Sequence, residues 1–304
     1  MKIPAPDLKD RPLFILNPTA GVHPVNFLIS KDLARRKKEL KCLKTLHVDH
    51  TQSLIKENLH NHTVFIAAGG DGTVHSVASQ LVGSEKILGV LPLGSGNGFA
   101  KEFGFKMNIR SLLSNINRGE SMDIDVIEIN DNLCLNVAGI GLDSFVAHSF
   151  NELKLRGFLP YIWLTMRTFL QLRPFHVIIR CGGELIADEE LFVLTLANTR
   201  QFGNNAFIAP DARPNDGKID LILIKPFPKI LGTLFIIRLF TKRINNSKYV
   251  RHITTDKEIV IETEETRFHI DGEPLKISGK VIVNIKKDFL KVLKTPHNKF
   301  ISKS

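Results

Sequence analysis

The chain has 304 residues, of which 43% are hydrophobic, so it is long enough for two domains that each bury a core. Its three cysteines lie far apart and make neither a disulfide framework nor a metal-binding knuckle, which favours a reducing cytoplasm. The net charge of +10 favours anionic partners, which could be nucleotide phosphates, acidic lipid headgroups or nucleic acid.

The first half of the chain alternates apolar runs with helix-like segments. We predict strands at 13–16, 44–49, 63–67 and 87–91, and helices at 27–40, 54–58, 74–81 and 109–116. This β/α alternation is typical of a parallel sheet covered on both faces. We therefore expect an α/β domain over residues 1–123.

Near residue 125 the pattern changes to short strands separated by turn signals such as Asp131-Asn132 and Asp271-Gly272. We predict strands at 125–129, 133–138, 175–180, 191–198, 219–224, 258–262, 267–270 and 277–285. Two other segments, 145–172 and 229–242, have the pattern of helices rich in Leu, Ile, Phe and basic residues. We expect residues 124–304 to form a mainly antiparallel β-sandwich, whose last residues could pack back on the first domain.

Three glycine-rich loops directly follow predicted strands of the first domain. They are Asn17-Pro18-Thr19-Ala20-Gly21, Gly69-Gly70-Asp71-Gly72-Thr73 and Leu93-Gly94-Ser95-Gly96-Asn97-Gly98. In an open parallel sheet, ligands bind outside the carboxyl ends of the strands. Glycines let an anion approach main-chain N–H groups, and the helix that begins after Asp71 adds positive potential. We therefore expect the three loops to converge on one phosphate-bearing ligand.

Asp71 is the unexpected member of these loops, because a carboxylate beside a phosphate repels it unless the carboxylate binds a metal or accepts a proton. We interpret Asp71 as Mg²⁺-linked or catalytic, and capping of the following helix is the alternative. The chain has no Walker-type Gly-x-x-x-x-Gly-Lys-Ser/Thr motif and no Gly-x-Gly-x-x-Gly after the first strand. A P-loop ATPase and a dinucleotide dehydrogenase are therefore disfavoured.

The three loops and three later motifs resemble, in chain order, the signatures of the diacylglycerol kinase catalytic-domain superfamily. The later motifs are Ala138-Gly139-Ile140-Gly141-Leu142-Asp143, the segment from Pro214 to Asp220, and Asp271-Gly272-Glu273. The superfamily includes bacterial diacylglycerol kinases and lipid kinases, sphingosine kinases and ceramide kinases. The resemblance implies an NAD kinase/diacylglycerol kinase-like fold and transfer of the γ-phosphoryl group of ATP, with Mg²⁺, to a lipid hydroxyl.

The resemblance also assigns roles to single residues. The positions that contact the nucleotide in relatives are Asn17, Gly69, Gly70, Gly72, Thr73 and Ser95, with Asn97 supporting its loop. Two carboxylates compete for the role of the base: Asp71 matches the acid of sphingosine and ceramide kinases, and Glu273 matches the acid of bacterial diacylglycerol kinases. We expect them to meet across the interdomain cleft. The alternative for Glu273 is an ordinary hairpin-turn residue.

Two further sites follow from the resemblance. Asp143 is a candidate for the lipid headgroup pocket, with a helix cap as the alternative. The Asp216 carboxylate and the main-chain carbonyls of Arg213 and Lys218 are candidates for a structural Mg²⁺ site. The alternative there is a plain Asp-Gly turn.

Two departures from the bacterial pattern affect the expected substrate. Gly98 stands where many bacterial diacylglycerol kinases have Asp, which sphingosine kinases also lack, and His75 resembles the sphingosine kinase pattern. These two details favour a sphingoid-type or related long-chain alcohol. Ser76 replaces a glutamate common to both branches. An NAD kinase-like enzyme and a non-catalytic lipid- or nucleotide-binding protein are the alternative functions.

The expected partners are a lipid substrate and an anionic membrane surface. Basic residues beside apolar ones, Arg167, Arg173, Arg238, Lys242 and Arg243, are candidates for docking on acidic lipid. Nucleic-acid binding would explain the charge but not the three loops, so we exclude it. We expect a cytoplasmic protein, peripheral to the inner face of the membrane, and leave a homodimer open.

Overall fold

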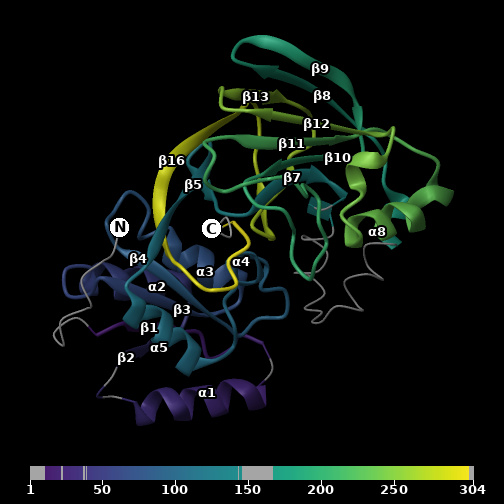
Figure 1. Cartoon of the computed structure of the whole chain (residues 1–304). Coiled ribbons are helices and arrows are strands. Elements are labelled where there is room, and N and C mark those ends of the chain that lie inside the picture. The colour runs from purple at the N-terminus through teal and green to yellow at the C-terminus, as the bar shows by residue number, and fades with distance from the viewer. Residues whose placement is uncertain are drawn as a thin grey trace. The chain divides into compact units, whose positions relative to one another are not determined.

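The computed structural model describes residues 11–21, 23–36, 38, 40–142, 144–145 and 167–300. The chain forms two compact units, the first from Met1–Ile124 and Asp288–Ser304 and the second from Asp125–Lys287. Figure 1 labels the elements of both. Among the described residues, no helix is long and apolar enough to cross a membrane.

The first unit is built on a parallel sheet. Its strands are β1 (Leu13–Leu16), β2 (Lys41–Lys44), β3 (Val64–Gly69), β4 (Ile87–Pro92) and the C-terminal end of β16 (Val281–Leu293). They lie in the order β2-β1-β3-β4-β16, and each neighbouring pair is parallel. Every residue of β1, β3 and β4 is buried, as expected for a sheet covered on both faces. This confirms the predicted α/β fold of the N-terminal half.

Helices cover this sheet. They are α1 (His23–Arg35), α2 (Val48–Asn58), α3 (Asp71–Ala78), α4 (Gly98–Glu102) and α5 (Ile109–Arg118). Figure 1 shows α1 and α3 on opposite sides of the sheet. Side chains fix several helix ends: Asn108 Oδ1 accepts a hydrogen bond from Ser111 N at 3.0 Å at the start of α5, and Gly119, with φ 64°, ends that helix.

The second unit contains two sheets. The first is six-stranded, in the order β12 (Val250–Thr255), β11 (Ile219–Ile224), β10 (Val193–Ala197), β7 (Val137–Gly141), β14 (Arg267–Ile270) and β15 (Glu273–Lys276). All five pairs in it are antiparallel. The other has the order β16, β13 (Ile259–Glu262), β8 (Phe175–Cys181) and β9 (Glu184–Leu191), with β5 (Ser121–Ile129) pairing both β16 and β6 (Asn132–Cys134). The predicted antiparallel sandwich is thereby confirmed.

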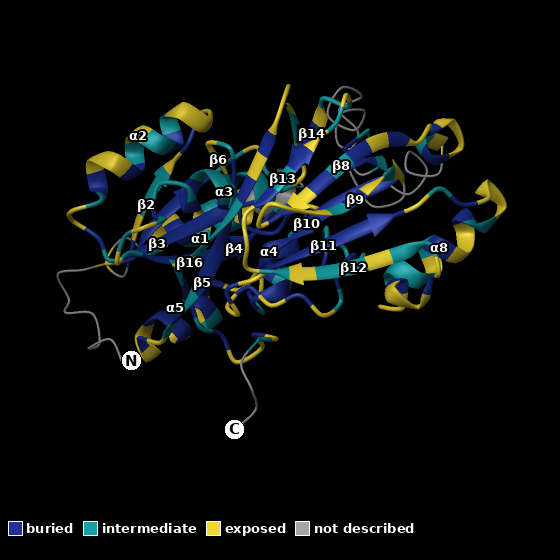
Figure 2. Ribbon diagram, turned by 90° about the horizontal axis from the view of Figure 1, so that it is seen from above, coloured by how far each residue is buried: buried dark blue, intermediate teal, exposed yellow. Residues whose placement is uncertain are grey.

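Two apolar clusters enclose the six-stranded sheet. One lies between the two sheets and draws on residues of both, such as Ile140, Leu196 and Leu221 against Val177 and Val283. The other covers the opposite face with Phe169, Phe192, Phe227 and Phe235, where α8 (Gly232–Phe240) packs. In Figure 2 the strands β10 and β11 are dark blue, whereas α8 is mostly teal and yellow. These two strands are buried on both faces, which explains why their sequences are apolar apart from the buried Thr195 and Asp220.

Several predicted elements need correction. The strand predicted at 44–49 is wrong, since β2 ends at Lys44 and the apolar side chains of Leu46 and Val48 are 80% and 58% exposed. The single strand predicted at 133–138 is two strands, β6 and β7. The helix predicted at 229–242 is present as η1 (Lys229–Leu231) and α8. Of the segment predicted at 145–172, residues 167–171 are helical, and most of the rest lies outside the described residues.

Candidate active site

The three glycine-rich loops of the first unit leave the same edge of the sheet. In the parallel register, Leu16 of β1 lies opposite Ala68 of β3, and Gly69 lies opposite Pro92 of β4. Each strand therefore ends level with its neighbour, and the loops that follow begin side by side. The backbone continues this arrangement, since Asn17 N donates to Ala68 O at 2.9 Å and Leu93 N donates to Gly69 O at 2.8 Å.

Glycines allow the loops to touch. Gly21 has φ +66°, and a Cβ atom at this position would lie 1.7 Å from Leu93 O. A Cβ atom at Gly94 would lie 2.6 Å from Gly70 Cα, and one at Gly70 would lie 3.3 Å from Gly94 Cα. Real side chains cannot fit at the shortest of these separations. The first loop thus touches the third, and the third touches the second.

Polar side chains fix the same three loops. Asn17 Nδ2 donates to Thr73 Oγ1 at 3.1 Å, which joins the first loop to the start of α3. Asn97 has φ +51° and holds its own loop, because its Oδ1 accepts from Gly94 N at 3.0 Å and its Nδ2 donates to Gly94 O at 2.7 Å. Asparagine tolerates this left-handed backbone better than most residues. The Ser95 side chain, in the same loop, is exposed.

Asp71 is the first residue of α3, where the helix dipole favours a negative charge. Its Oδ1 accepts a hydrogen bond from Phe99 N at 3.3 Å, and its Oδ2 is 3.1 Å from where a Cβ atom of Gly96 would lie. The carboxylate thus faces the third loop. The structure brings together all the predicted nucleotide-site residues of the first unit, Asn17, Gly69, Gly70, Gly72, Thr73, Ser95 and Asn97, with Asp71.

Lys101, on α4, was not singled out from the sequence. Burial lowers the pKa of its ammonium group, and the negative charge of Asp71 acts in the opposite direction. A cation close to Asp71, on the helix that follows the third glycine-rich loop, is well placed to bind phosphate. Its position on a helix that starts right after the third loop was the available signal.

Glu273 lies in the second unit, as the first residue of β15. It follows a two-residue turn in which Asp271 and Gly272 have φ 53° and 86°, the pattern of a tight type I′ hairpin. The Glu273 side chain is exposed. Because Asp71 and Glu273 belong to different units, the expected meeting of these two carboxylates stays a prediction.

The hairpin before Glu273 is held by Asp271. The Asp271 carboxylate accepts hydrogen bonds from Asn136 N at 2.7 Å and from Leu135 N at 3.0 Å. Its charge and hydrogen bonding, together with the dominant effect of burial, raise the pKa of the Cys134 thiol well above its ordinary value. Sequence reasoning placed Asp271 in the motif but gave it no role. Its role in the fold is to fix the turn that carries Glu273.

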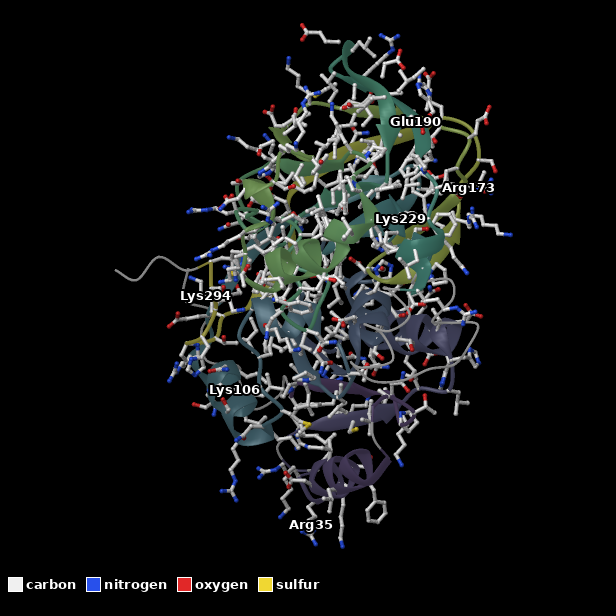
Figure 3. All side chains as sticks on the ribbon, turned by 90° about the vertical axis from the view of Figure 1, so that its right-hand side faces the viewer. Arg35, Lys106, Arg173, Glu190, Lys229 and Lys294 are labelled. Carbon is white, nitrogen blue, oxygen red and sulfur yellow. The ribbon has the colours of Figure 1, made fainter. Side chains whose placement is uncertain are left out.

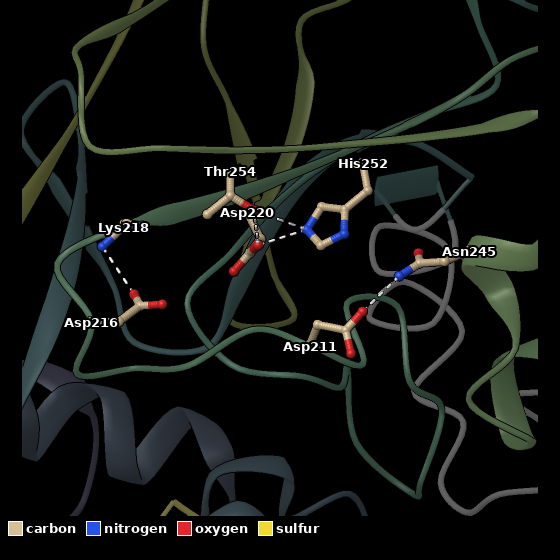
Figure 4. A network of polar contacts seen from close by, with 7 residues as sticks. All are labelled: Asp211, Asp216, Lys218, Asp220, Asn245, His252 and Thr254. Atoms are coloured by element: carbon tan, nitrogen blue, oxygen red, sulfur yellow. Dashed lines mark hydrogen bonds and ion pairs between the residues drawn. The ribbon is translucent and has the colours of Figure 1, made fainter.

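The two remaining predicted sites have different outcomes. Asp143 lies outside the described residues. The Asp216 carboxylate accepts a hydrogen bond from Lys218 N at 3.1 Å (Figure 4), and its pKa is raised, chiefly by burial and also by Asp220 and Asp125. Arg213, three residues before Asp216, is exposed. Among the described residues, no group of three His, Cys, Asp or Glu side chains is arranged to hold a metal ion. The Mg²⁺ site at Asp216 therefore stays a prediction.

His252 and Asp220 form a second polar cluster of this unit (Figure 4). His252 Nε2 lies 2.6 Å from Asp220 Oδ1, and Thr254 Oγ1 donates to the same oxygen at 2.7 Å. The hydrogen bond to Asp220 raises the pKa of His252 above its ordinary value, while burial acts in the opposite direction. The folded protein therefore binds this proton more tightly than the unfolded chain does.

This shift predicts how stability depends on pH. The protonated pair stabilises the fold fully below the ordinary histidine pKa of about 6.5, and the stabilisation is lost as pH rises through the higher folded-state pKa. Urea unfolding should show that His252→Gln lowers the free energy of unfolding more at pH 6 than at pH 9. His176→Gln is the control, because its pair with Asp188 is about half exposed. An equal cost of His252→Gln at both pH values would contradict the prediction.

The fold and the loops define the class of protein. Residues 11–129 match the model of the diacylglycerol kinase catalytic domain, and residues 136–294 match the YegS C-terminal NAD kinase beta sandwich-like domain. The chain is 32% identical to a probable YegS-like lipid kinase of Klebsiella pneumoniae over 72% of this chain and 73% of the relative. It is 29% identical to a diacylglycerol kinase of Bacillus subtilis, and the match covers 74% of this chain and 76% of the relative. The chain belongs to the diacylglycerol kinase and YegS-like lipid kinase family.

Solved structures share this fold. A putative diacylglycerol kinase from Bacillus anthracis superposes with a TM-score of 0.75 at 23% identity, over 94% of this chain and 98% of that one. An NAD kinase from Archaeoglobus fulgidus, solved in complex with ATP, superposes with a TM-score of 0.58 at 14% identity. This match covers 94% of this chain and 95% of the NAD kinase chain. At such identities these likenesses establish the architecture, which lipid kinases and NAD kinases have in common.

Proposed function

We propose that the chain transfers the γ-phosphoryl group of ATP to a hydroxyl group of a lipid. The observation that carries the proposal is the convergence of three glycine-rich loops at one sheet edge, where Gly21, Gly70 and Gly94 allow direct backbone contact. Main-chain N–H groups at this edge, together with the positive end of α3, can bind the phosphate groups of a nucleotide. Membership of the lipid kinase family supports the choice of a lipid as acceptor.

The Asp71 carboxylate suits a Mg²⁺ ion carried by the nucleotide. Mg²⁺ prefers oxygen ligands and keeps several waters or substrate phosphates, so one protein carboxylate is a sufficient contribution. Asp71 Oδ1 accepts a hydrogen bond from Phe99 N, and the carboxylate faces the third loop, beside which the phosphates would lie. A bound Mg²⁺ would neutralise charge on the transferring group. We likewise propose that Asp216, with the carbonyls of Arg213 and Lys218, holds a second Mg²⁺ of structural role.

Glu273 is the better candidate for the base. Its carboxylate is exposed and makes no hydrogen bond to another described residue, so it is available to accept the proton of a lipid hydroxyl. The turn before it is anchored by Asp271, which keeps its backbone in place. Asp71, in contrast, is tied to the nucleotide loops. In this proposal Asp71 acts on the phosphates and Glu273 acts on the acceptor.

The test of the activity is phosphate transfer from γ-labelled ATP to a panel of acceptors. The panel holds diacylglycerol, sphingosine, ceramide and extracted membrane lipids in mixed micelles, with NAD⁺ as the acceptor of the rival NAD kinase activity. We expect labelled product from at least one lipid and none from NAD⁺. Transfer to NAD⁺ alone would overturn the proposal, and ATP binding without transfer to any acceptor would identify a non-catalytic relative.

Glu273→Gln tests the base. We expect kcat to fall by about 10²- to 10⁴-fold, the usual contribution of a general base, with little change in the KM for ATP. The measurement is the initial rate of both enzymes over a range of ATP and lipid concentrations. The matched control is Glu265→Gln in the same unit, whose carboxylate is bound by Arg267. Unchanged turnover in Glu273→Gln would show that Glu273 is not the base and would leave Asp71 as the candidate.

We also propose that the enzyme works in the cytoplasm at the inner face of a membrane. The chain has a net charge of +10, and Figure 3 shows basic side chains such as Arg35 on α1 and Arg173 on the second unit projecting outward. Acidic lipid headgroups would attract such a surface.

A further inference from the structure

Helix α8 exposes apolar side chains in a pattern that the fold does not need. Ile230, in η1, and Leu234 and Ile237, in α8, are 88%, 45% and 52% exposed. They are spaced four and three residues apart, so they lie on one face of the helix. The opposite face is buried through Gly232 and Phe235, which belong to the packing around Phe169 and Phe227. The exposed row is therefore additional to the core.

Leu170 extends this apolar row from another segment. Its side chain is 59% exposed, and its carbonyl oxygen accepts a hydrogen bond from Lys229 Nζ. Lys229, which is labelled in Figure 3, also donates a hydrogen bond from Nζ to Leu172 O at 3.2 Å. Lys229 thus ties the start of η1 to residues 170–172, which places Leu170 beside the α8 row.

The same part of the chain is strongly basic. From Leu221 to Thr255 the sequence has no Asp or Glu. It carries seven basic residues, Lys225, Lys229, Arg238, Lys242, Arg243, Lys248 and Arg251. No carboxylate of a described residue forms an ion pair with Arg238, Lys242, Arg243 or Lys248, whereas Lys225 pairs with Glu189. We call Ile230, Leu234, Ile237 and these four unpaired cations the α8 surface.

A groove of about 400 Å³ opens in the α8 surface. Its apolar walls include Phe227, Leu231 and Phe235, and its polar members include Arg238, Lys248 and Tyr249. Lys248 Nζ lies 5.2 Å from the centre of the Tyr249 ring. Apolar walls beside two cations fit an amphiphile with an anionic head, such as one phospholipid molecule.

We propose that the α8 surface docks on an anionic phospholipid bilayer. Exposed Ile and Leu on one helical face with Lys and Arg around them are the features by which an interfacial helix inserts into headgroups. A second copy of the chain would bring two sets of like charges together in a symmetric contact. Bound nucleic acid would place its charged phosphates against the exposed side chains of Ile230, Leu234 and Ile237, which is unfavourable. The inference rests on the proposed function, because a kinase for membrane lipids has to reach the bilayer.

The experiment measures sedimentation of the full chain with vesicles. One set is pure phosphatidylcholine and the other contains 30% phosphatidylglycerol, each at low and high salt. The apolar variant is Ile230→Ser, Leu234→Ser and Ile237→Ser, and the charge variant is Arg238→Gln, Arg243→Gln and Lys248→Gln. The matched controls remove exposed groups of the same kinds elsewhere: Leu28→Ser, Leu46→Ser and Leu185→Ser for the first, and Arg180→Gln, Lys276→Gln and Lys280→Gln for the second.

We expect the wild type to bind the anionic vesicles, with an affinity that falls as salt rises. Each variant should bind at least about tenfold more weakly, since one cation near a membrane contributes roughly fivefold and one inserted aliphatic side chain a similar factor. The controls should bind like the wild type within about threefold. The single change Ile230→Ser, at the most exposed position, should give a measurable loss if the triple variant is unstable.

Phosphorylation of a short-chain lipid below its micelle concentration separates this inference from the proposed function. The α8 variants should keep wild-type turnover on this dissolved substrate. Wild-type turnover with no vesicle binding, or equal losses in the variants and controls, would overturn the docking surface and leave the kinase intact. Conversion of a dimer to a monomer by the apolar variant would also overturn it, because the row would then be a subunit contact. Vesicle binding without any kinase activity would instead overturn the proposed function.

Discussion

Replacing Asp71 with Asn should lower kcat by about a thousandfold or more while the fold stays intact. Asn keeps the shape of the side chain and can still accept from Phe99 N, as Asp71 Oδ1 does. Asn cannot supply the negative charge that would hold a Mg²⁺ ion on the phosphates. It also cannot raise the pKa of Lys101 against the lowering effect of burial, as the charge of Asp71 does. Losses of this size are usual when a group that acts on the transferring phosphoryl is removed.

The measurement is turnover of labelled ATP together with the urea unfolding curve of the same preparation. Asp49→Asn is the matched control, because Asp49 is also an acid in the first turn of a helix of this unit but does not belong to any of the three glycine-rich loops. We expect Asp49→Asn to change kcat by less than about twofold. If Asp71→Asn kept more than a tenth of the wild-type kcat, Asp71 would have no part in the chemistry.

The largest effect on stability should come from Asp271→Ala. The substitution leaves the buried N–H groups of Leu135 and Asn136 without their carboxylate partner, and it places Ala at φ 53°. Each unsatisfied buried donor costs about 1–3 kcal/mol, and left-handed backbone adds roughly 1 kcal/mol for Ala. We therefore expect the free energy of unfolding to fall by about 3–7 kcal/mol. Turnover should fall as well, since Glu273 follows directly.

Chemical denaturation and lipid phosphorylation measure the two effects. Asp131→Ala is the matched control, because Asp131 occupies the exposed turn between β5 and β6. We expect it to change stability by less than about 1 kcal/mol. Asp271→Asn keeps one acceptor and tolerates the positive φ, so it should lie between the wild type and Asp271→Ala. Equal stabilities of the Asp271→Ala and Asp131→Ala variants would show that the carboxylate does not hold the hairpin.

The parts of the fold that could be predicted from the sequence are those with a strong local signal. Buried parallel strands such as β1 and β4 are unbroken apolar runs, and β11 and β14 have the predicted bounds. The prediction failed where burial does not follow the apolar pattern. Leu46 and Val48 look like strand residues but are exposed, and β9 was missed because its Glu-rich face is open to solvent.

The candidate site divides in the same way. The three loops could be found because glycine, Asn and Asp at successive strand ends have a direct backbone meaning. The role of Asp271 could not be found, since its partners Leu135 and Asn136 are far away in the sequence. The same holds for Asp125, whose Oδ2 accepts from Gly217 N at 2.7 Å and holds the turn that carries Asp216. Long-range hydrogen bonds leave no periodic trace in a sequence.

The last strand has a consequence for how this protein is made. In the first unit β16 pairs with β4 through Lys291 and Val292, and Gly83 N donates to Phe289 O at 2.8 Å. A ribosome adds these two residues roughly 10 to 40 s after it has completed β4, because they lie about 200 residues further along the chain. Throughout that interval β4 has an open edge. A nascent chain stalled before residue 288 should therefore be a better chaperone substrate than the finished polypeptide.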